Sequence, residues 1–212
     1  RICSNLANSS NPNSSSPLEI LLRRRRMTRR FLNGPTDTDL SSLCQLALRA
    51  PSAGFSQGSH FLVLTGDNLT RFWQVSQAGN WFSSTAPGVL DATAVILILG
   101  DHEAYTERYS KPDKAQHNLE QADNWVTPFW LTDAAMAAEN LLLLIEEKRW
   151  GALLFGLFGD PRVTLDAFAV PTTVSCVGAI AVGFRHPDDQ PSGSPTTRAG
   201  RPASEVVHLG HW

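Results

Sequence analysis

The sequence is poor in cysteine and in charge, and it has no long apolar run. Cys3, Cys44 and Cys176 are far apart and form no C-x-x-C pair, so we expect neither a disulfide framework nor a cysteine-bound zinc ion. The same cysteine usage predicts a cytoplasmic protein. No stretch approaches a transmembrane run, so we expect no membrane partner. His208 and His211 are three residues apart but have no third ligand nearby, and we predict no metal site.

The composition predicts one domain of ordinary size. The chain has 212 residues, of which 42% are hydrophobic and 18% are charged. This length is sufficient for a sizeable core, and the low charge indicates that part of the surface is buried in an oligomer. Residues 1–16 are rich in Asn and Ser, so we predict that they are disordered and that the domain spans residues 17–212.

Capping and periodicity patterns predict the secondary structure. Ser16 and Glu19 form a capping box around Pro17, which predicts a helix from Pro17 to about Arg26. The same reasoning predicts an α+β fold in which helices wrap a small sheet. The further helices are expected at residues 37–50, 68–77, 127–149 and 161–168, and the strands at residues 60–64, 92–100 and 172–184.

Three consecutive segments have distinctive compositions. The run at 92–100 is continuously apolar, which is typical of a strand covered on both faces. Residues 101–124 are polar and charged, so we expect an excursion or lid with one short helix at most. The helix at 127–149 is apolar on nearly all sides, which predicts a central, buried position.

A dense cluster of arginines is the most unusual feature of the sequence. Six of the 18 Lys and Arg residues fall between Arg23 and Arg30, although the formal charge of the chain is only -2. Such cations repel one another unless an anion lies against them. Three partners fit: nucleic acid, a membrane or export machinery, and the phosphate of a cofactor. No apolar segment follows Arg29 and Arg30, which excludes an export signal.

A loop of small residues, Pro51–Gly58, precedes the predicted strand at 60–64. Ser, Ala and Gly leave backbone N–H groups accessible and let a flat ligand approach closely. Taken alone, the pattern fits both an ordinary turn and a ligand-binding loop.

Five motifs in this order resemble the nitroreductase family of FMN-dependent oxidoreductases, over roughly residues 18–212. The resemblance implies a small, mostly antiparallel sheet and a long central helix, in an intertwined homodimer with two FMN molecules at the subunit interface. The motifs are the segment Arg25–Phe31, the loop Pro51–Gln57, a helix with Trp130, Asp133, Ala135 and Asn140–Leu144, the stretch Gly151–Phe158, and the tail Arg201–Trp212.

The resemblance also implies which residues bind FMN. Arg25 and Arg29 would hold the phosphate, because a guanidinium forms charge-assisted and often bidentate hydrogen bonds with it. Either Arg198 or Arg201 would add a second cation there. Ser52 would hydrogen-bond the flavin, and residues 154–156 would present backbone groups to flavin N5. Residues 154–156 are Leu154, Phe155 and Gly156, and the remaining residues of this site are Arg26, Met27, Pro51, Ala53 and Gln57.

Two positions depart from the family pattern. Met27 stands where the family has serine, so a hydroxyl contact with phosphate is absent or replaced by a backbone N–H. Phe55 stands where the family has asparagine, which removes a polar group near the flavin and narrows the pocket. We expect these changes to affect substrate preference rather than FMN binding, because the arginines supply most of the charge.

The resemblance implies an FMN-dependent NAD(P)H oxidoreductase with small-molecule substrates. A reduced nicotinamide would deliver hydride to flavin N5, and an electron-poor acceptor such as a nitroaromatic or quinone would then replace it, which predicts ping-pong kinetics. No side chain is expected to act as an acid or base.

Two alternatives differ in class. One is a flavin-cleaving, dehalogenating or peptide-oxidising branch of the same fold. The other is nucleic-acid binding through Arg23–Arg30. We expect no nucleic-acid partner, because no recognised binding module accompanies the arginines and the rest of the chain is net negative.

Overall fold

The computed structural model describes residues 15–212 and confirms the α+β fold. Of residues 1–16, which we predict to be disordered, residues 1–14 lie outside the described part of the chain. For them the disorder stays a prediction.

Three helices begin where the sequence predicts them, and each begins at a side-chain cap. Ser16 Oγ accepts the N–H of Glu19 at 3.2 Å, and the Glu19 carboxylate accepts the N–H of Ser16 at 2.6 Å. Thr36 and Asp39 form the same reciprocal pair, and the Asp160 side chain caps a third helix. These caps satisfy N–H groups that have no partner within the helix. The three helices are α1 (Pro17–Arg24), α2 (Asp37–Ala47) and α7 (Pro161–Ala167).

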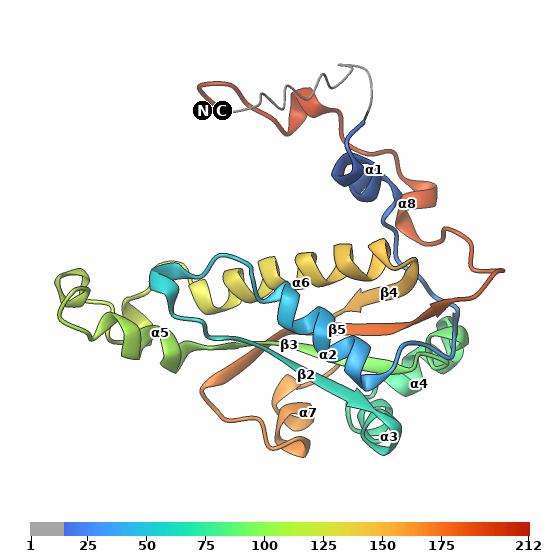
Figure 1. Ribbon diagram of the computed structural model, residues 1–212, viewed down its shortest axis with the longest axis horizontal. Coiled ribbons are helices and arrows are strands. Elements are labelled where there is room, and N and C mark those ends of the chain that lie inside the picture. The colour runs from blue at the N-terminus through green and yellow to red at the C-terminus, as the bar shows by residue number, and fades with distance from the viewer. Residues whose placement is uncertain (1–14) are drawn as a thin grey trace, which may run out of the picture.

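The remaining elements complete a layered body (Figure 1). The other helices are α3 (Gly66–Val75), α4 (Ala78–Thr85), α5 (His102–Tyr109), α6 (Phe129–Glu147) and α8 (Ser194–Thr197). The strands are β1 (Phe31–Leu32), β2 (Ser59–Thr65), β3 (Ala94–Asp101), β4 (Trp150–Phe155) and β5 (Val174–Arg185).

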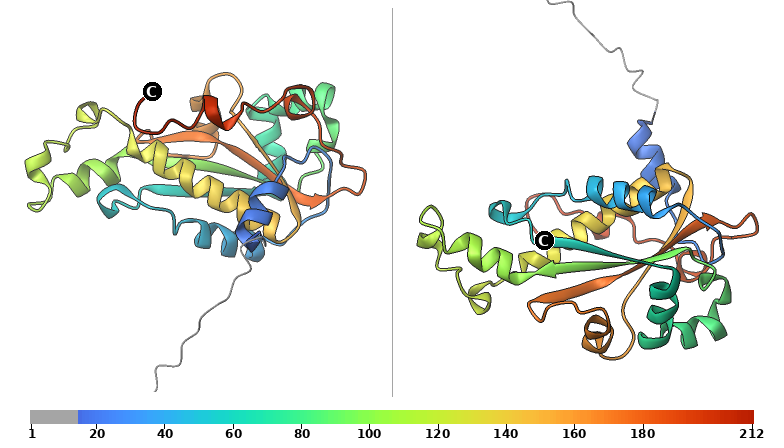
Figure 2. Two further views of the ribbon diagram at one scale, coloured as in Figure 1. Left: turned by 90° about the horizontal axis from the view of Figure 1, so that it is seen from above. Right: turned by 60° about the horizontal axis from the view of Figure 1, so that its bottom comes forward.

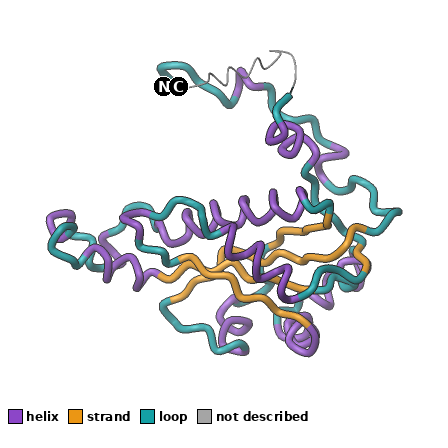
Figure 3. The backbone as a smooth tube through the Cα atoms, viewed as in Figure 1, coloured by secondary structure: helices purple, strands orange, loops and turns teal. Residues whose placement is uncertain are grey.

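The strands form one antiparallel sheet with β3 and β5 at its centre. β3 pairs with β2 along one edge and with β5 along the other. β5 also pairs with β4, and its last two residues pair with β1. Figure 3 shows these strands as one layer with helices on both sides.

β3 separates two apolar cores because its side chains alternate between the faces of the sheet. Ile96 and Ile98 pack with residues of α2 and α6 on one face. Val95 and Leu97 pack with residues of α3, α4 and α7 on the other. Figure 1 shows these two helical layers above and below the sheet. The continuous apolar run therefore belongs to a strand covered on both faces, as predicted.

The long helix α6 is the predicted central element. It packs against α2 and against the strands β2, β3 and β4. Its apolar side chains are largely buried, and so are two carboxylates, Asp133 and Glu146.

Four of the α-helices and strands escaped the sequence prediction: the two-residue strand β1, the four-residue helix α8, α4 and β4. α4 contains Gly79 and several Ser and Thr residues, which are weak helix formers. It forms because Phe82 packs against Trp73 and Phe155, with ring centroids 6.0 and 5.2 Å apart. β4 is a short, uniformly apolar run, and periodicity cannot distinguish such a run from a buried helix. Its pairing with β5 makes it a strand.

α1 and the segment that follows β5 project from one side of the layered body (Figures 1 and 2). Leu18, Ile20 and Leu22 of α1 are about half exposed, and Leu209 and Trp212 are almost fully exposed. Exposed apolar side chains gathered in this way are typical of a surface that another chain covers. Within residues 15–212, no helix combines the length and the apolar character needed to span a bilayer.

Replacing Leu97 with alanine should lower the free energy of unfolding by about 2–5 kcal/mol, because truncating a fully buried side chain leaves a cavity. Chemical denaturation at fixed protein concentration measures this change. The control is Val163→Ala in α7, where the side chain is 58% exposed and the expected change is at most about 0.5 kcal/mol. Equal losses in the two variants would contradict the central position of β3.

Candidate functional site

A buried carboxylate anchors the first part of the arginine-rich segment. Glu146, near the end of α6, is 3% exposed. Its Oε1 accepts from Arg24 Nε at 2.8 Å, and its Oε2 accepts from Arg185 Nη2 at 2.7 Å. A buried carboxylate without such partners would be strongly destabilising. The pair with Arg24 therefore ties the end of α1 to α6.

A second buried carboxylate anchors the rest of the segment. Asp189 lies in the chain that follows β5, and its Oδ1 accepts the backbone N–H groups of Arg29 at 2.9 Å and Arg30 at 3.0 Å. Its Oδ2 and its carbonyl accept from the Arg26 guanidinium. Arg24 and Arg26 are thus paired with carboxylates of the same chain. Fewer arginines of the cluster are therefore available to an external anion than the sequence alone indicates.

Arg25 lies between these anchored neighbours and next to Glu139, which lines a cavity on α6. Its Nε is 3.8 Å from Oε1 of Glu139, which is beyond hydrogen-bond distance. Its Nη1 is buried and has no hydrogen-bond partner among residues 15–212. Leaving a buried donor without a partner is costly, so this position suits an added anion.

The cavity that Glu139 lines, which we call the α6–β4 cavity, has a volume of about 340 Å³. Neighbouring residues of β4 project to opposite faces of the sheet. The ring of Phe155 packs against Phe82 and Trp73 in the far core, whereas the side chain of Leu154 is partly exposed. The walls of the cavity include Ala135, Ala138, Glu139, Leu154, Phe155 and Gly156.

Met27 connects the arginine-rich segment to the same strand. Its Sδ accepts the backbone N–H of Leu154 at 3.4 Å. Its side chain also packs against both apolar cores. The side chain that replaces the family serine therefore points into the protein and stabilises the junction with β4.

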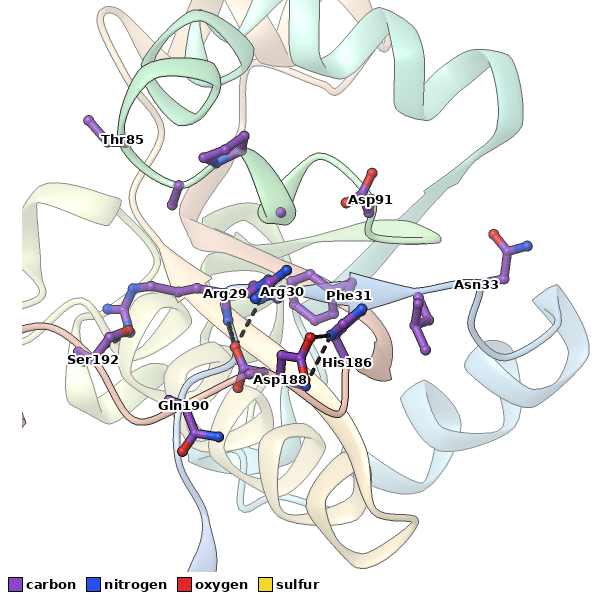
Figure 4. A pocket seen from close by; sticks show the side chains of 15 residues that line it. Arg29, Arg30, Phe31, Asn33, Thr85, Asp91, His186, Asp188, Gln190 and Ser192 are labelled. Carbon is purple, nitrogen blue, oxygen red and sulfur yellow. Dashed lines mark hydrogen bonds and ion pairs between the residues drawn. The ribbon is translucent and has the colours of Figure 1, made fainter.

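Arg29 lines a different and larger cavity, of about 1070 Å³ (Figure 4). Its Nη1 donates to the carbonyl of Ser192 at 3.2 Å and to its Oγ at 3.3 Å. Arg30 and His186 line the same cavity. Within one chain, the structure does not bring the predicted phosphate ligands Arg25 and Arg29 to a common cavity.

The small-residue loop borders a third cavity, which we call the loop cavity, of about 570 Å³. Within the loop, Ser52 Oγ accepts the N–H of Gln57 at 2.8 Å. Ala53 is turned away from the cavity, because its N–H donates to Oδ2 of Asp133 at 2.8 Å. The walls of the loop cavity include Pro51, Ser52, Phe55, Gln57, His60 and Ala137.

The α6–β4 cavity and the loop cavity lie on opposite faces of α6. Successive residues of an α-helix are rotated by about 100°, so Ala137 projects about 160–200° away from Ala135 and Glu139. Ala135 and Glu139 line the α6–β4 cavity, and Ala137 lines the loop cavity. In one chain, the two groups of predicted flavin-binding residues are therefore separated by the central helix.

Arg198 and Arg201 are exposed and line none of these three cavities. Arg201 Nε lies 3.4 Å from Oε2 of Glu205. The geometry of one chain does not choose between the two arginines as a phosphate ligand.

The conserved-sequence profile of the Nitroreductase family matches residues 22–184, which is most of the chain. The chain belongs to the nitroreductase family. Members of this family are in general flavin-dependent oxidoreductases. No curated protein matches the sequence.

Solved structures share the fold over nearly their whole length. Nitroreductase CinD from Lactococcus lactis, in complex with chloramphenicol, is 16% identical with a TM-score of 0.69, over 92% of this chain and 100% of that chain. A nitroreductase-like protein from Streptococcus mutans is 18% identical with a TM-score of 0.67, over 91% and 97%. A nitroreductase-like family protein from Bacillus cereus is 15% identical with a TM-score of 0.65, over 92% and 97%. At these identities the likeness establishes the nitroreductase fold alone.

The nitroreductase motifs did not indicate the carboxylates that organise this site. Glu146 could have been found, because an acidic residue in a helix that is apolar on nearly all sides must pair when it is buried. Asp189 lies in a loop rich in Pro, Ser and Gly, and no local pattern distinguishes it from its neighbour Asp188.

Neither cysteine within the described residues is a candidate nucleophile. Burial raises the pKa of the Cys44 and Cys176 thiols to about 11. At neutral pH almost none of either thiol is in the reactive thiolate form.

Glu146→Gln should lower the free energy of unfolding by about 3–5 kcal/mol, because it leaves Arg24 and Arg185 without their buried counter-charge. Urea denaturation measures the loss. Glu147→Gln makes the same chemical change at an exposed neighbour, so it should have an effect within about 0.5 kcal/mol. If Glu146→Gln were as stable as Glu147→Gln, the anchoring role of Glu146 would be wrong.

Proposed function

We propose that this protein is an FMN-dependent oxidoreductase that passes electrons from a reduced nicotinamide to an electron-poor small molecule, such as a nitroaromatic or a quinone. The observation that carries the proposal is the Arg25 guanidinium: its buried Nη1 has no hydrogen-bond partner among the described residues, and its Nε is 3.8 Å from Oε1 of Glu139, which lines the α6–β4 cavity. A guanidinium suits a phosphate in charge and geometry. The apolar walls of the cavity suit a flat ring. The residues present therefore fit FMN.

FMN, when bound, would supply the hydride acceptor at N5 and with it the redox chemistry. Arg25 would bind its phosphate, held in place by neighbours that are anchored to Glu146 and Asp189. The backbone of residues 154–156 would present polar groups to the ring, and the Leu154 side chain would exclude water from it. We assign no proton-transfer step to any side chain.

The separation of the two cavities by α6 supports a homodimer. One copy would supply Arg25 and residues 154–156 to a flavin, and the other copy would supply Pro51, Ser52 and Gln57. Two such flavins would lie at the interface, which the exposed apolar side chains of α1 and of the C-terminal segment would help to form. Arg29, with Arg198 or Arg201, would complete the phosphate site in that assembly.

The proposed acceptor class draws on one relative and one side chain. Structures of the relative CinD contain chloramphenicol, 4-nitrophenol or nicotinic acid, which are small aromatic molecules. In this chain Phe55 is 74% exposed at the loop cavity. An exposed aromatic ring there would favour stacking of a flat acceptor.

The purified protein should be yellow, release FMN on denaturation, and lose its visible flavin absorbance anaerobically on addition of NADH or NADPH. Chromatography of the released flavin and anaerobic absorbance spectra measure this. A colourless protein that also fails to bind added FMN would contradict the proposal. FMN binding without reduction by either nicotinamide would instead favour a flavin-cleaving, dehalogenating or peptide-oxidising branch.

Arg25→Ala should raise the dissociation constant for FMN about 10- to 100-fold, because it removes a charge-assisted hydrogen bond of about 1.5–3 kcal/mol. Quenching of FMN fluorescence during titration measures the constant. The matched control is Arg23→Ala, since Arg23 is exposed and forms no ion pair within the described chain. Equal weakening in both variants would indicate general electrostatic attraction rather than a phosphate contact at Arg25.

A further inference from the structure

The loop Ser52–Gln57 has an unfavourable backbone conformation. Phe55 and Gln57 both have φ = 56°, in the left-handed region that side chains other than glycine rarely adopt. Gly54 precedes them with φ = 61°. Residues in such conformations persist only where surrounding groups determine the backbone. We therefore expect contacts with the rest of the protein to hold this loop in its conformation.

α6 holds the loop through one buried carboxylate. Asp133 is 2% exposed, and its Oδ2 accepts the backbone N–H of Ala53 at 2.8 Å and the hydroxyl of Tyr105 at 2.7 Å. Tyr105 belongs to α5 and is fully buried. The Tyr105 hydroxyl and the Ala53 N–H thus converge on the same oxygen atom, which couples α5 to the loop.

α5 holds the loop a second time through Arg108. The Arg108 Nε donates to the carbonyl of Gly54 at 2.9 Å, and its two terminal nitrogens bind the carboxylate of Asp113 at 2.9 and 2.7 Å. The ring of Tyr109 lies directly over Gly54, because a Cβ there would be only 2.7 Å from Tyr109 Cε2. Figure 1 shows α5 and this loop at the same end of α6.

We propose that Tyr105, Arg108 and Asp133 are positioning residues, which hold the Ser52–Gln57 loop in the conformation that lines the loop cavity. The proposal rests on the proposed function in one respect, namely that this loop contacts FMN. The excursion at 101–124 then has a defined role, because its first helix fixes the backbone of the loop. None of these three residues is itself part of the wall of the loop cavity.

Burial, reinforced by the hydrogen bond with Asp133, raises the pKa of Tyr105 well above its usual value. The hydroxyl therefore keeps its proton throughout the neutral and mildly alkaline range. Tyr105 acts as a permanent donor to Asp133 and leaves the other lone pairs of Oδ2 available to the Ala53 N–H.

Tyr105→Phe tests the proposal, because it removes only the hydroxyl. In the apoprotein, amide hydrogen exchange of a peptide covering residues 50–58 should accelerate about tenfold, while exchange in β3 stays unchanged. The dissociation constant for FMN should rise about three- to tenfold. Tyr109→Phe is the matched control on the same helix, since no hydrogen bond of its hydroxyl is present in the described structure, and it should change neither quantity.

Arg108→Ala and Asp113→Ala form a second pair that does not depend on the folding of Tyr105→Phe. Both variants remove the ion pair, but only Arg108→Ala removes the donor to the Gly54 carbonyl. We expect faster exchange at 50–58 in Arg108→Ala alone. Unchanged local exchange in both Tyr105→Phe and Arg108→Ala, or acceleration spread equally over the whole protein, would overturn the proposal. If the wild-type chain bound no FMN, the proposed function would fail, and the exchange data would still decide whether these residues hold the loop.

Discussion

The burial of charge along α6 is the constraint on which both parts of the candidate site depend. The helix lies between α2 and the sheet, and two of its acidic residues, Asp133 and Glu146 near its two ends, are buried and cannot be hydrated. Each must find donors within the protein. Asp133 finds them in the small-residue loop and in α5, and Glu146 finds them at the end of α1 and in β5. The need to pair these carboxylates thus places two distant stretches of the sequence against one helix.

The arginine-rich segment acquires a different meaning in this setting. As a sequence it is a dense positive charge that could attract any polyanion. In the fold, Arg24 and Arg26 pair with buried carboxylates, and Asp189 also accepts the backbone N–H groups of Arg29 and Arg30. Among residues 15–212, Arg25 is left with a buried Nη1 that has no hydrogen-bond partner, next to Glu139 in the wall of the α6–β4 cavity. The arginines repel one another in the unfolded chain, whereas in the fold the paired Arg24 and Arg26 hold the guanidinium of Arg25 in place.

Where a local pattern is long and strong, the sequence predicts the fold well. The apolar run at 92–100 and the helix at 127–149 became β3 and α6, because burial on all sides leaves an unmistakable composition. α4 and β4 were missed for opposite reasons. α4 has poor helix formers that are stabilised by aromatic packing, and β4 is too short for its period to be distinguished. Both depend on contacts with residues that are distant in the sequence.

The sequence by itself determined the class of the protein and the motifs that carry its chemistry, since caps, apolar periods and motif order are local properties of the chain. The tertiary structure decided which side chains remain available. It directed Met27 inward, committed Arg26 to Asp189, and separated the small-residue loop from β4 by the full width of α6. The physical reason is that the availability of a charged or polar group depends on which partner is within hydrogen-bond distance, and those partners lie up to 163 residues away along the chain.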